Sequence, residues 1–150
     1  MASDRIVIRA MTRDDLSAVG RLMGQLGYKI ENDILIGRFE GLSGSPDHLA
    51  LVADMSGNVV GFVHAHVRNA LEKPLEVLAQ SLAVDGCHRR RGIGQALMAS
   101  VETWARDRGV ASVSLGTEIT RHDARAFYER LGYTRFATSH LMRKVLDCDD

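Results

Sequence analysis

The sequence has little of several features that mark whole classes of protein. Its 150 residues include only two cysteines, Cys87 and Cys148, so no disulfide framework is expected and reduced thiols in the cytoplasm are the simpler interpretation. Lys plus Arg equal Asp plus Glu, 19 of each, so no global field favours nucleic acid or a membrane surface. No apolar run approaches the roughly 18 residues of a membrane span, and no signal-peptide core follows the first residues. We therefore expect a soluble cytoplasmic protein that binds neither nucleic acid nor membrane.

Repeats, low-complexity segments and linkers are also missing. With 45% hydrophobic residues, the chain is long enough for one good core. The sequence therefore predicts a single domain over residues 1–150.

Hydrophobic periodicity and turn signals predict that strands and helices share one fold. Strands are expected at residues 5–10, 49–53, 59–67, 76–84, 111–117, 134–138 and 140–146. Helices are expected over residues 12–27, 32–39, 92–109 and 120–132. The spacing of strand, helix and strand around the third helix implies a right-handed crossover, which makes 76–84 and 111–117 parallel. The fold class is α/β (α+β), with six to seven strands and about four helices.

The stretch over residues 76–109 carries the main functional pattern. A strand candidate is followed by a turn with three arginines and then by Gly92, Gly94 and an amphipathic helix. Free N–H groups, the positive end of the helix dipole and nearby cations together predict a site for a phosphorylated ligand. The two glycines let the backbone approach phosphate oxygens because no Cβ stands in the way.

Two other phosphate motifs are excluded, and the alternative of a turn that binds no ligand is less favoured. The sequence has no Gly-x-x-x-x-Gly-Lys-Ser/Thr string, and Leu97 stands where the dinucleotide fingerprint needs its third glycine. A solvated basic turn that merely begins a core helix would not need both Gly92 and Gly94.

Within the strand, Glu76, Gln80, Leu82 and Val84 have the same parity and are predicted to share one face.

Two motifs stand out within this order of elements: Leu82-Ala83-Val84 followed by Arg89-x-x-Gly92-x-Gly94, and the string over residues 126–133, Ala-Phe-Tyr-Glu-Arg-Leu-Gly-Tyr. Together with the order of elements, they resemble the GCN5-related N-acetyltransferases (GNAT) over nearly the whole chain. The resemblance implies the GNAT fold, a mixed, mostly antiparallel sheet whose central parallel pair splays apart. It also implies acetyl-coenzyme A as co-substrate and direct acetyl transfer, within a ternary complex, to a primary amine.

The resemblance further implies which residues bind the coenzyme. Main-chain groups of Leu82 and Val84 would pair with the pantetheine arm as an added strand does. The pyrophosphate would sit on N–H groups of the turn that opens the helix. The implied coenzyme-binding residues are Leu82, Ala83, Val84, Arg89, Arg90, Arg91, Gly92, Ile93, Gly94 and Gln95.

For the chemistry, the resemblance implies Tyr128 as the acid that protonates the departing thiolate. The alternative for Tyr128 is a packed aromatic whose hydroxyl bonds a backbone group. The base stays open, because Gln80 stands where many relatives carry Glu and an amide takes no proton. Glu76 acting through a water and His122 are the two candidates.

Alternatives remain for the function as a whole. A small-molecule amine is the favoured acceptor; a protein or peptide amine, and a coenzyme-binding regulatory module without turnover, are the alternatives. Family members are often dimers, so a homodimer is one expected state. His64 and His66 alternate along one strand face without a third ligand nearby in sequence, so no metal is expected.

Overall fold

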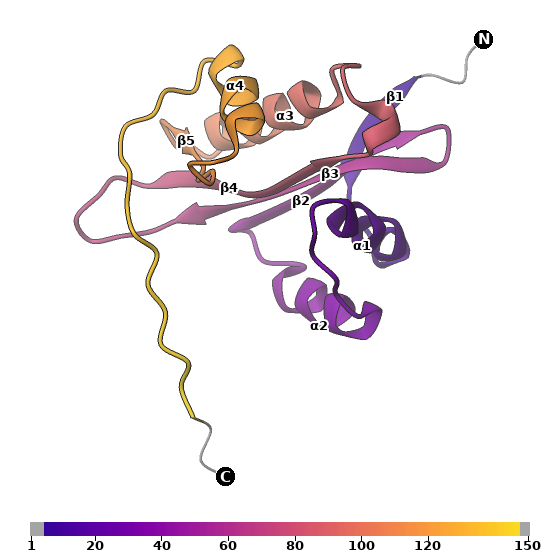
Figure 1. Cartoon of the computed structure of the whole chain (residues 1–150), viewed down its shortest axis with the longest axis horizontal. Helices are drawn as coiled ribbons and strands as arrows, with labels where there is room; N and C mark the ends of the chain where they lie inside the picture. The colour runs from indigo at the N-terminus through magenta and orange to yellow at the C-terminus, as the bar shows by residue number, and fades with distance from the viewer. Residues whose placement is uncertain (1–4, 148–150) are drawn as a thin grey trace. The chain divides into compact units, whose positions relative to one another are not determined.

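The computed structural model describes residues 5–147. The chain forms two compact units that divide after Gly116, and each is described by itself. The first unit contains a five-stranded sheet in the order β1-β2-β3-β4-β5 (Figure 1). Its strands are β1 (Ile6–Ala10), β2 (His48–Met55), β3 (Asn58–Arg68), β4 (Glu76–Val84) and β5 (Val113–Ser114). Neighbouring strands are antiparallel except β4 and β5, which are parallel. The predicted mixed, mostly antiparallel sheet with one parallel pair is confirmed.

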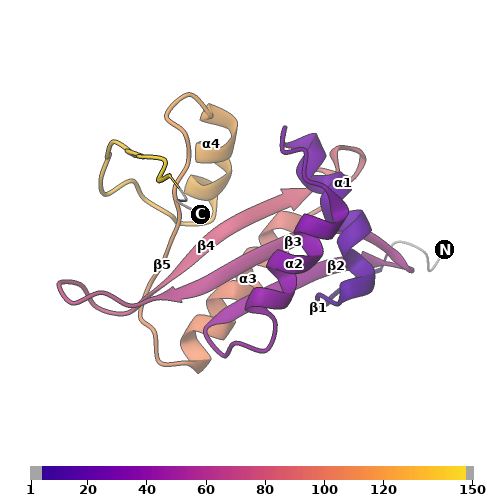
Figure 2. The ribbon, with the colours of Figure 1, turned by 90° about the horizontal axis from the view of Figure 1, so that it is seen from below.

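Helices cover both faces of this sheet. The helices of the first unit are η2 (Arg13–Asp15), α1 (Leu16–Gln25), α2 (Asn32–Leu42), η3 (Gly86–His88) and α3 (Ile93–Asp107). Both ribbon views show α1 and α2 on one face and α3 on the other (Figures 1 and 2). The apolar stripe of α1, with Leu16, Val19 and Leu22, packs with Val52 and Phe62 of the sheet. Burial of this stripe, more than helix propensity, stabilises α1.

Thr12 and Asp15 form a capping box at the start of the first helix. Oδ2 of Asp15 accepts hydrogen bonds from the backbone N–H of Thr12 at 2.8 Å and from its hydroxyl at 3.2 Å. Arg9 adds two contacts of 2.8 Å to the same carboxylate. The first turn is a short 3₁₀ segment, η2, before α1 begins. Asp15 is therefore a buried carboxylate whose oxygens are all paired.

The hairpin of β2 and β3 contains one irregularity that matters for the site. Ala53 pairs with Gly61 and Asp54 pairs with Val59, so Val60 is an extra residue on β3. Such a bulge shifts the register of every later pair by one residue. The bulge lies beside Gly61.

The second unit contains α4 (His122–Arg130), and Gly132 ends it with φ +96°. The strands predicted at 134–138 and 140–146 are wrong, because the described residues after Gly132 form no strand. The side chains of Phe136, Leu141 and Met142 are 78%, 99% and 92% exposed. Alternating apolar residues suit a strand, but a strand forms only with a hydrogen-bonded neighbour, which local sequence does not provide.

The strand count is thus five in the described residues instead of six to seven. The strand predicted at 111–117 is also shorter, since only Val113 and Ser114 pair with β4. No helix among the described residues is long and apolar enough to span a membrane.

Candidate functional site

The segment of residues 85–92, here called the arginine turn, joins the end of β4 to the start of α3. Its first residue, Asp85, accepts a hydrogen bond from the backbone N–H of Cys87 at 3.1 Å, and this bond holds the pKa of the Asp85 carboxyl below its ordinary value. From α1, Oε1 of Gln25 accepts the backbone N–H of Gly86 at 2.9 Å. The start of the turn is therefore anchored both locally and by α1.

The end of the arginine turn adopts a left-handed backbone at two positions. Arg90 has φ +67° and Gly92 has φ +78°. Glycine accepts this region freely, whereas a residue with a Cβ adopts it at a cost. Positive φ at alternate residues turns successive N–H groups toward a common concavity that suits an anion. Strain held at a turn of this kind is typical of ligand sites.

Helix α3 begins without a capping side chain. Gly92 is its N-cap residue, and no side chain accepts the N–H groups of the first turn, which begins with Ile93, Gly94 and Gln95. The Ile93 side chain is buried, so only its main chain is available to a ligand. A 15-residue helix with an uncapped N-terminus presents free donors and the positive end of its dipole. This is the geometry that binds phosphate groups.

Three guanidinium groups surround this helix start. Arg89, Arg90 and Arg91 are all exposed. Across residues 5–147, no carboxylate forms an ion pair with any of them. Their charges are thus available to a ligand.

The end of β4 has an open edge beside the arginine turn. β5 pairs only with Val77 and Leu78, so the two parallel strands separate after Leu78. On its other side, Leu82 still pairs with Val63 of β3. No second strand of the described chain pairs with residues 79–84. The predicted splay of the parallel pair is therefore present, and an extended ligand can add to this edge as a strand.

A bulge in β4 lies at Gln80. Ala79 is opposite Ala65 and Ser81 is opposite His64, so Gln80 has no partner on β3. Such a bulge disrupts the ladder locally and increases the twist of the strand.

The bulge also reverses which face later residues of β4 occupy. Glu76 is opposite Arg68, whereas Leu82 is opposite Val63, and Arg68 and Val63 lie on opposite faces of β3. The prediction that Glu76, Leu82 and Val84 share one face is therefore wrong. Simple parity fails because the strand is not regular between them.

Glu76 is held by three neighbours. Its Oε2 accepts the Ser112 hydroxyl at 2.9 Å, and its Oε1 accepts the Ser114 hydroxyl at 2.8 Å. The Arg68 guanidinium lies 3.5 Å from Oε1. Glu76 thus joins β3, β4 and the β5 segment through its carboxylate.

Tyr128 belongs to the second unit, where aromatic rings surround it. Its ring packs edge-on against Phe127 and Tyr133, with centroids 5.0 and 5.9 Å apart. The Tyr128 carbonyl accepts the backbone N–H of Tyr133 at 3.0 Å. Burial raises the pKa of the Tyr128 hydroxyl, so it is protonated at neutral pH. His122, the other candidate of this unit, begins α4 and is exposed.

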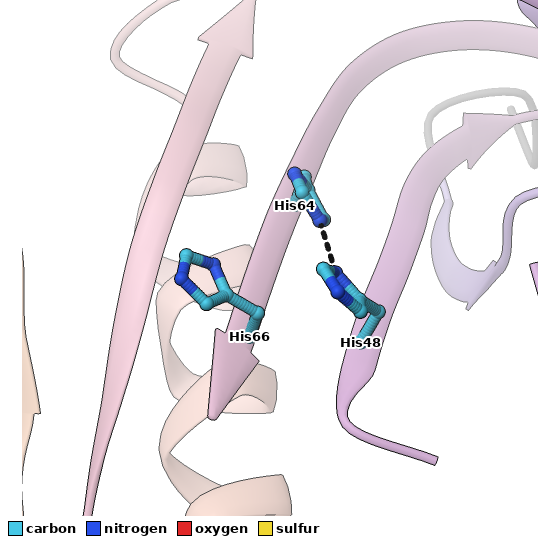
Figure 3. A group of neighbouring side chains, drawn as sticks. All are labelled: His48, His64 and His66. Atoms are coloured by element: carbon cyan, nitrogen blue, oxygen red, sulfur yellow. Dashed lines mark hydrogen bonds between the residues drawn. The ribbon is translucent and has the colours of Figure 1, made fainter. Parts of the chain in front are cut away.

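The structure also brings together three histidines, His48, His64 and His66, here called the histidine cluster (Figure 3). His48 lies on β2 directly opposite His66 of β3. His64 and His66 could be recognised from their alternation along one strand. His48 could not, because it belongs to the neighbouring strand β2. The pairing of β2 with β3 would have pointed to His48, but the bulge at Val60 shifts that pairing by one residue from a regular hairpin.

The parallel strands diverge beside an uncapped helix N-terminus, and an arrangement of this kind suits a phosphorylated ligand. The acetyltransferase (GNAT) family model matches residues 14–133, and the chain belongs to that family.

Individual relatives are more distant. The chain is 32% identical to mouse N-acetyltransferase family 8 member 3 over 85 residues, 56% of this chain and 38% of the relative. It is 39% identical to mouse N-alpha-acetyltransferase 80 over 75 residues, 50% of this chain and 22% of the relative. The matches thus span well under half the length of these relatives.

Among solved structures, the fold is similar to aminoglycoside N-acetyltransferase AAC(6')-Iy in complex with coenzyme A. The TM-score is 0.84 at 22% identity, covering 93% of this chain and 95% of the other. At this identity the likeness concerns the fold alone.

Proposed function

We propose that the protein is an acetyl-coenzyme A-dependent N-acetyltransferase that acts on a primary amine of a small molecule. One observation carries the proposal: the arginine turn and the uncapped start of α3 lie beside the unpaired edge of β4. The turn supplies donors and cations for a diphosphate, and the edge supplies main-chain groups for an extended amide-containing arm. Membership of the acetyltransferase family supports this assignment.

The coenzyme contacts follow from these two features. The diphosphate binds N–H groups between Arg89 and Gln95, with the guanidinium groups of Arg89, Arg90 and Arg91 around it. Leu82 and Val84 pair with the pantetheine arm through their main chains. Ala83 and Ile93 contribute only backbone, because both side chains are buried.

The reaction proposed is a direct transfer. The amine nitrogen attacks the thioester carbonyl, the C–S bond breaks, and the sulfur receives the proton of the Tyr128 hydroxyl. The amine loses its proton to a water, and Glu76 accepts that proton. The main-chain N–H of Val84, at the end of β4, donates to the developing oxyanion. The proposed transfer uses no metal. The role of Tyr128 is supported by the family resemblance.

The experiment that tests the function is a thiol-release assay with acetyl-coenzyme A and a panel of amines. The panel includes an aminoglycoside, a polyamine, an amino sugar and peptides with a free α-amine. Turnover with a small-molecule amine is the expected result. Turnover with peptides alone would instead favour a protein N-acetyltransferase, which the match to an N-alpha-acetyltransferase supports.

A coenzyme-binding module without turnover is the other alternative, because Gln80 stands at the usual position of the base. Coenzyme binding by calorimetry with no thiol release from any amine would favour it. A homodimer in the cytoplasm stays a prediction, and sedimentation velocity measures the oligomeric state.

A further inference from the structure

The histidine cluster lies on one face of the sheet, apart from the arginine turn. His48 of β2 is opposite His66 of β3, and His64 lies two residues before His66 on the same strand. All three side chains therefore share one face of the sheet. Phe62, two residues before His64 on β3, packs with residues of α1 and α2 in the core. Figure 3 shows the His48 ring reaching from β2 to the His64 ring, with His66 next along β3. Ligand-forming nitrogens of the three rings all lie within 4.8 Å of one another.

These separations are close to those of a metal site. With Zn–N bonds of about 2.0–2.1 Å, tetrahedral geometry places ligand nitrogens about 3.3 Å apart and ring centres about 5 Å apart. Here Nδ1 of His48 and Nε2 of His64 are 3.0 Å apart. The ring centroids are separated by 5.3, 5.5 and 6.0 Å. Small side-chain rotations are enough to bring the third nitrogen into place.

The protonation state of the rings also suits metal binding. Burial lowers the pKa of His64 to about 4, and repulsion from His48 and His66 adds to the effect. Burial likewise lowers the pKa of His66. Rings that stay neutral at pH 7 keep a lone pair for a cation.

One nitrogen of the cluster lacks any partner in the described structure. Nδ1 of His66 is buried and forms no hydrogen bond. A buried polar atom without a partner is costly, and native structures rarely keep one without a reason. The next side chains along that face, Arg68 and Glu76, pair with each other at 3.5 Å, so their charges offset one another beside the cluster.

We propose that His48, His64 and His66 form a binding site for one divalent transition-metal ion, with Zn²⁺ as the best match. Imidazole nitrogens select such ions over Mg²⁺ or Ca²⁺, which prefer oxygen. Three protein ligands leave a fourth position for water or another donor. When the ion binds, the proton in the hydrogen bond between His48 and His64 moves to the other nitrogen of its ring.

The test uses the full chain without a polyhistidine tag, first treated with a chelator and then titrated with ZnCl₂ by calorimetry. One equivalent is expected to bind, and His48→Gln or His64→Gln should weaken binding by roughly 100-fold or more. His122→Gln, an exposed histidine on α4, is the matched control and should bind like the wild type. Absence of stoichiometric binding, or binding unchanged in the cluster variants, would overturn the proposal.

A measurement on the unaltered protein keeps the test valid if a cluster variant fails to fold. Long-range ¹H–¹⁵N spectra of the wild type report each imidazole ring. On addition of ZnCl₂, the three cluster rings should shift together at one equivalent, and Co²⁺ should give the visible absorption of a tetrahedral site. Shifts confined to His88, His122 or His140 would show that the metal binds elsewhere and would refute the site.

Discussion

Gly61 of β3 lies directly opposite Val84 of β4, where the central strand ends and α3 crosses the sheet. A Cβ built at Gly61 would lie 3.2 Å from Cγ2 of Ile93, 3.3 Å from Cδ1 of Leu97 and 3.2 Å from the Ala83 carbonyl oxygen. Gly61 thus lets the first turn of α3 approach the sheet closely. That approach sets where the helix N-terminus stands relative to the end of β4.

Gly61→Ala is therefore expected to destabilise the protein by about 1–3 kcal/mol, because the added methyl overpacks α3 against the sheet. Urea unfolding followed by circular dichroism measures the change. Gly41→Ala in α2 is the control, since a Cβ there meets nothing within 4 Å. The control should be neutral or slightly stabilising. Equal stability of the two variants would contradict the close approach of α3.

Asp15→Asn is expected to lower stability at pH 7 by about 2–4 kcal/mol, because it removes the buried carboxylate of a partly buried ion pair. Hydrogen bonding to Arg9 holds the pKa of Asp15 below its ordinary value of 3.8. A depressed carboxyl pKa stabilises the fold above the unfolded pKa, and this stabilisation is lost as pH falls through the folded pKa. The difference in free energy of unfolding between the wild type and the variant should therefore shrink below about pH 4. Urea unfolding at several pH values measures it. A stability difference that stays constant down to pH 2 would contradict the assignment.

Tyr128→Phe should lower kcat by about 10²–10⁴ if the hydroxyl protonates the departing thiolate. Because burial raises the pKa of Tyr128, the acid form persists through neutral pH, and the loss of kcat that follows deprotonation of this hydroxyl should come at alkaline pH. Tyr28→Phe, an exposed tyrosine, is the control and should leave the rate unchanged. Near-normal turnover of Tyr128→Phe with a good acceptor would exclude the acid role.

Arg91→Gln should weaken acetyl-coenzyme A binding roughly 3–10-fold at low salt, because it removes one exposed cation from the diphosphate site, and the loss should shrink as salt rises. Arg106→Gln, in the last turn of α3, is the matched control with no expected effect. Calorimetry at two ionic strengths measures both. Identical affinities for the two variants would argue that the guanidinium groups are not part of the site.

Much of this architecture could be predicted because its signals are local. The strand at 76–84 and the helix that starts at the paired glycines each depend on neighbouring residues, and the structure contains both. What failed depends on pairing between strands. A bulge at Gln80 reversed the predicted face of Glu76, and the segment after Gly132 has strand-like alternation without a partner.

The histidine cluster shows the same limit. Continuing the register of the Asp54–Val59 pair without the bulge would place His48 opposite Ala65, on the other face from His64 and His66. One extra residue, Val60, brings the three rings together. Bulges carry no strong local signal, so a third ligand on a neighbouring strand is hidden from a sequence argument.

The central claim is that the start of α3 binds the diphosphate of the coenzyme. Titration of acetyl-coenzyme A by calorimetry into wild type, Gly94→Val and the helix control Gly41→Val tests it most directly. Gly94 lies in the first turn of α3 without a positive φ, so a valine there is compatible with the helical backbone and adds a side chain where the diphosphate is proposed to bind. The account predicts binding by the wild type and the control and loss of roughly 100-fold or more in Gly94→Val. No binding by the wild type, or equal affinity in all three proteins, would contradict it.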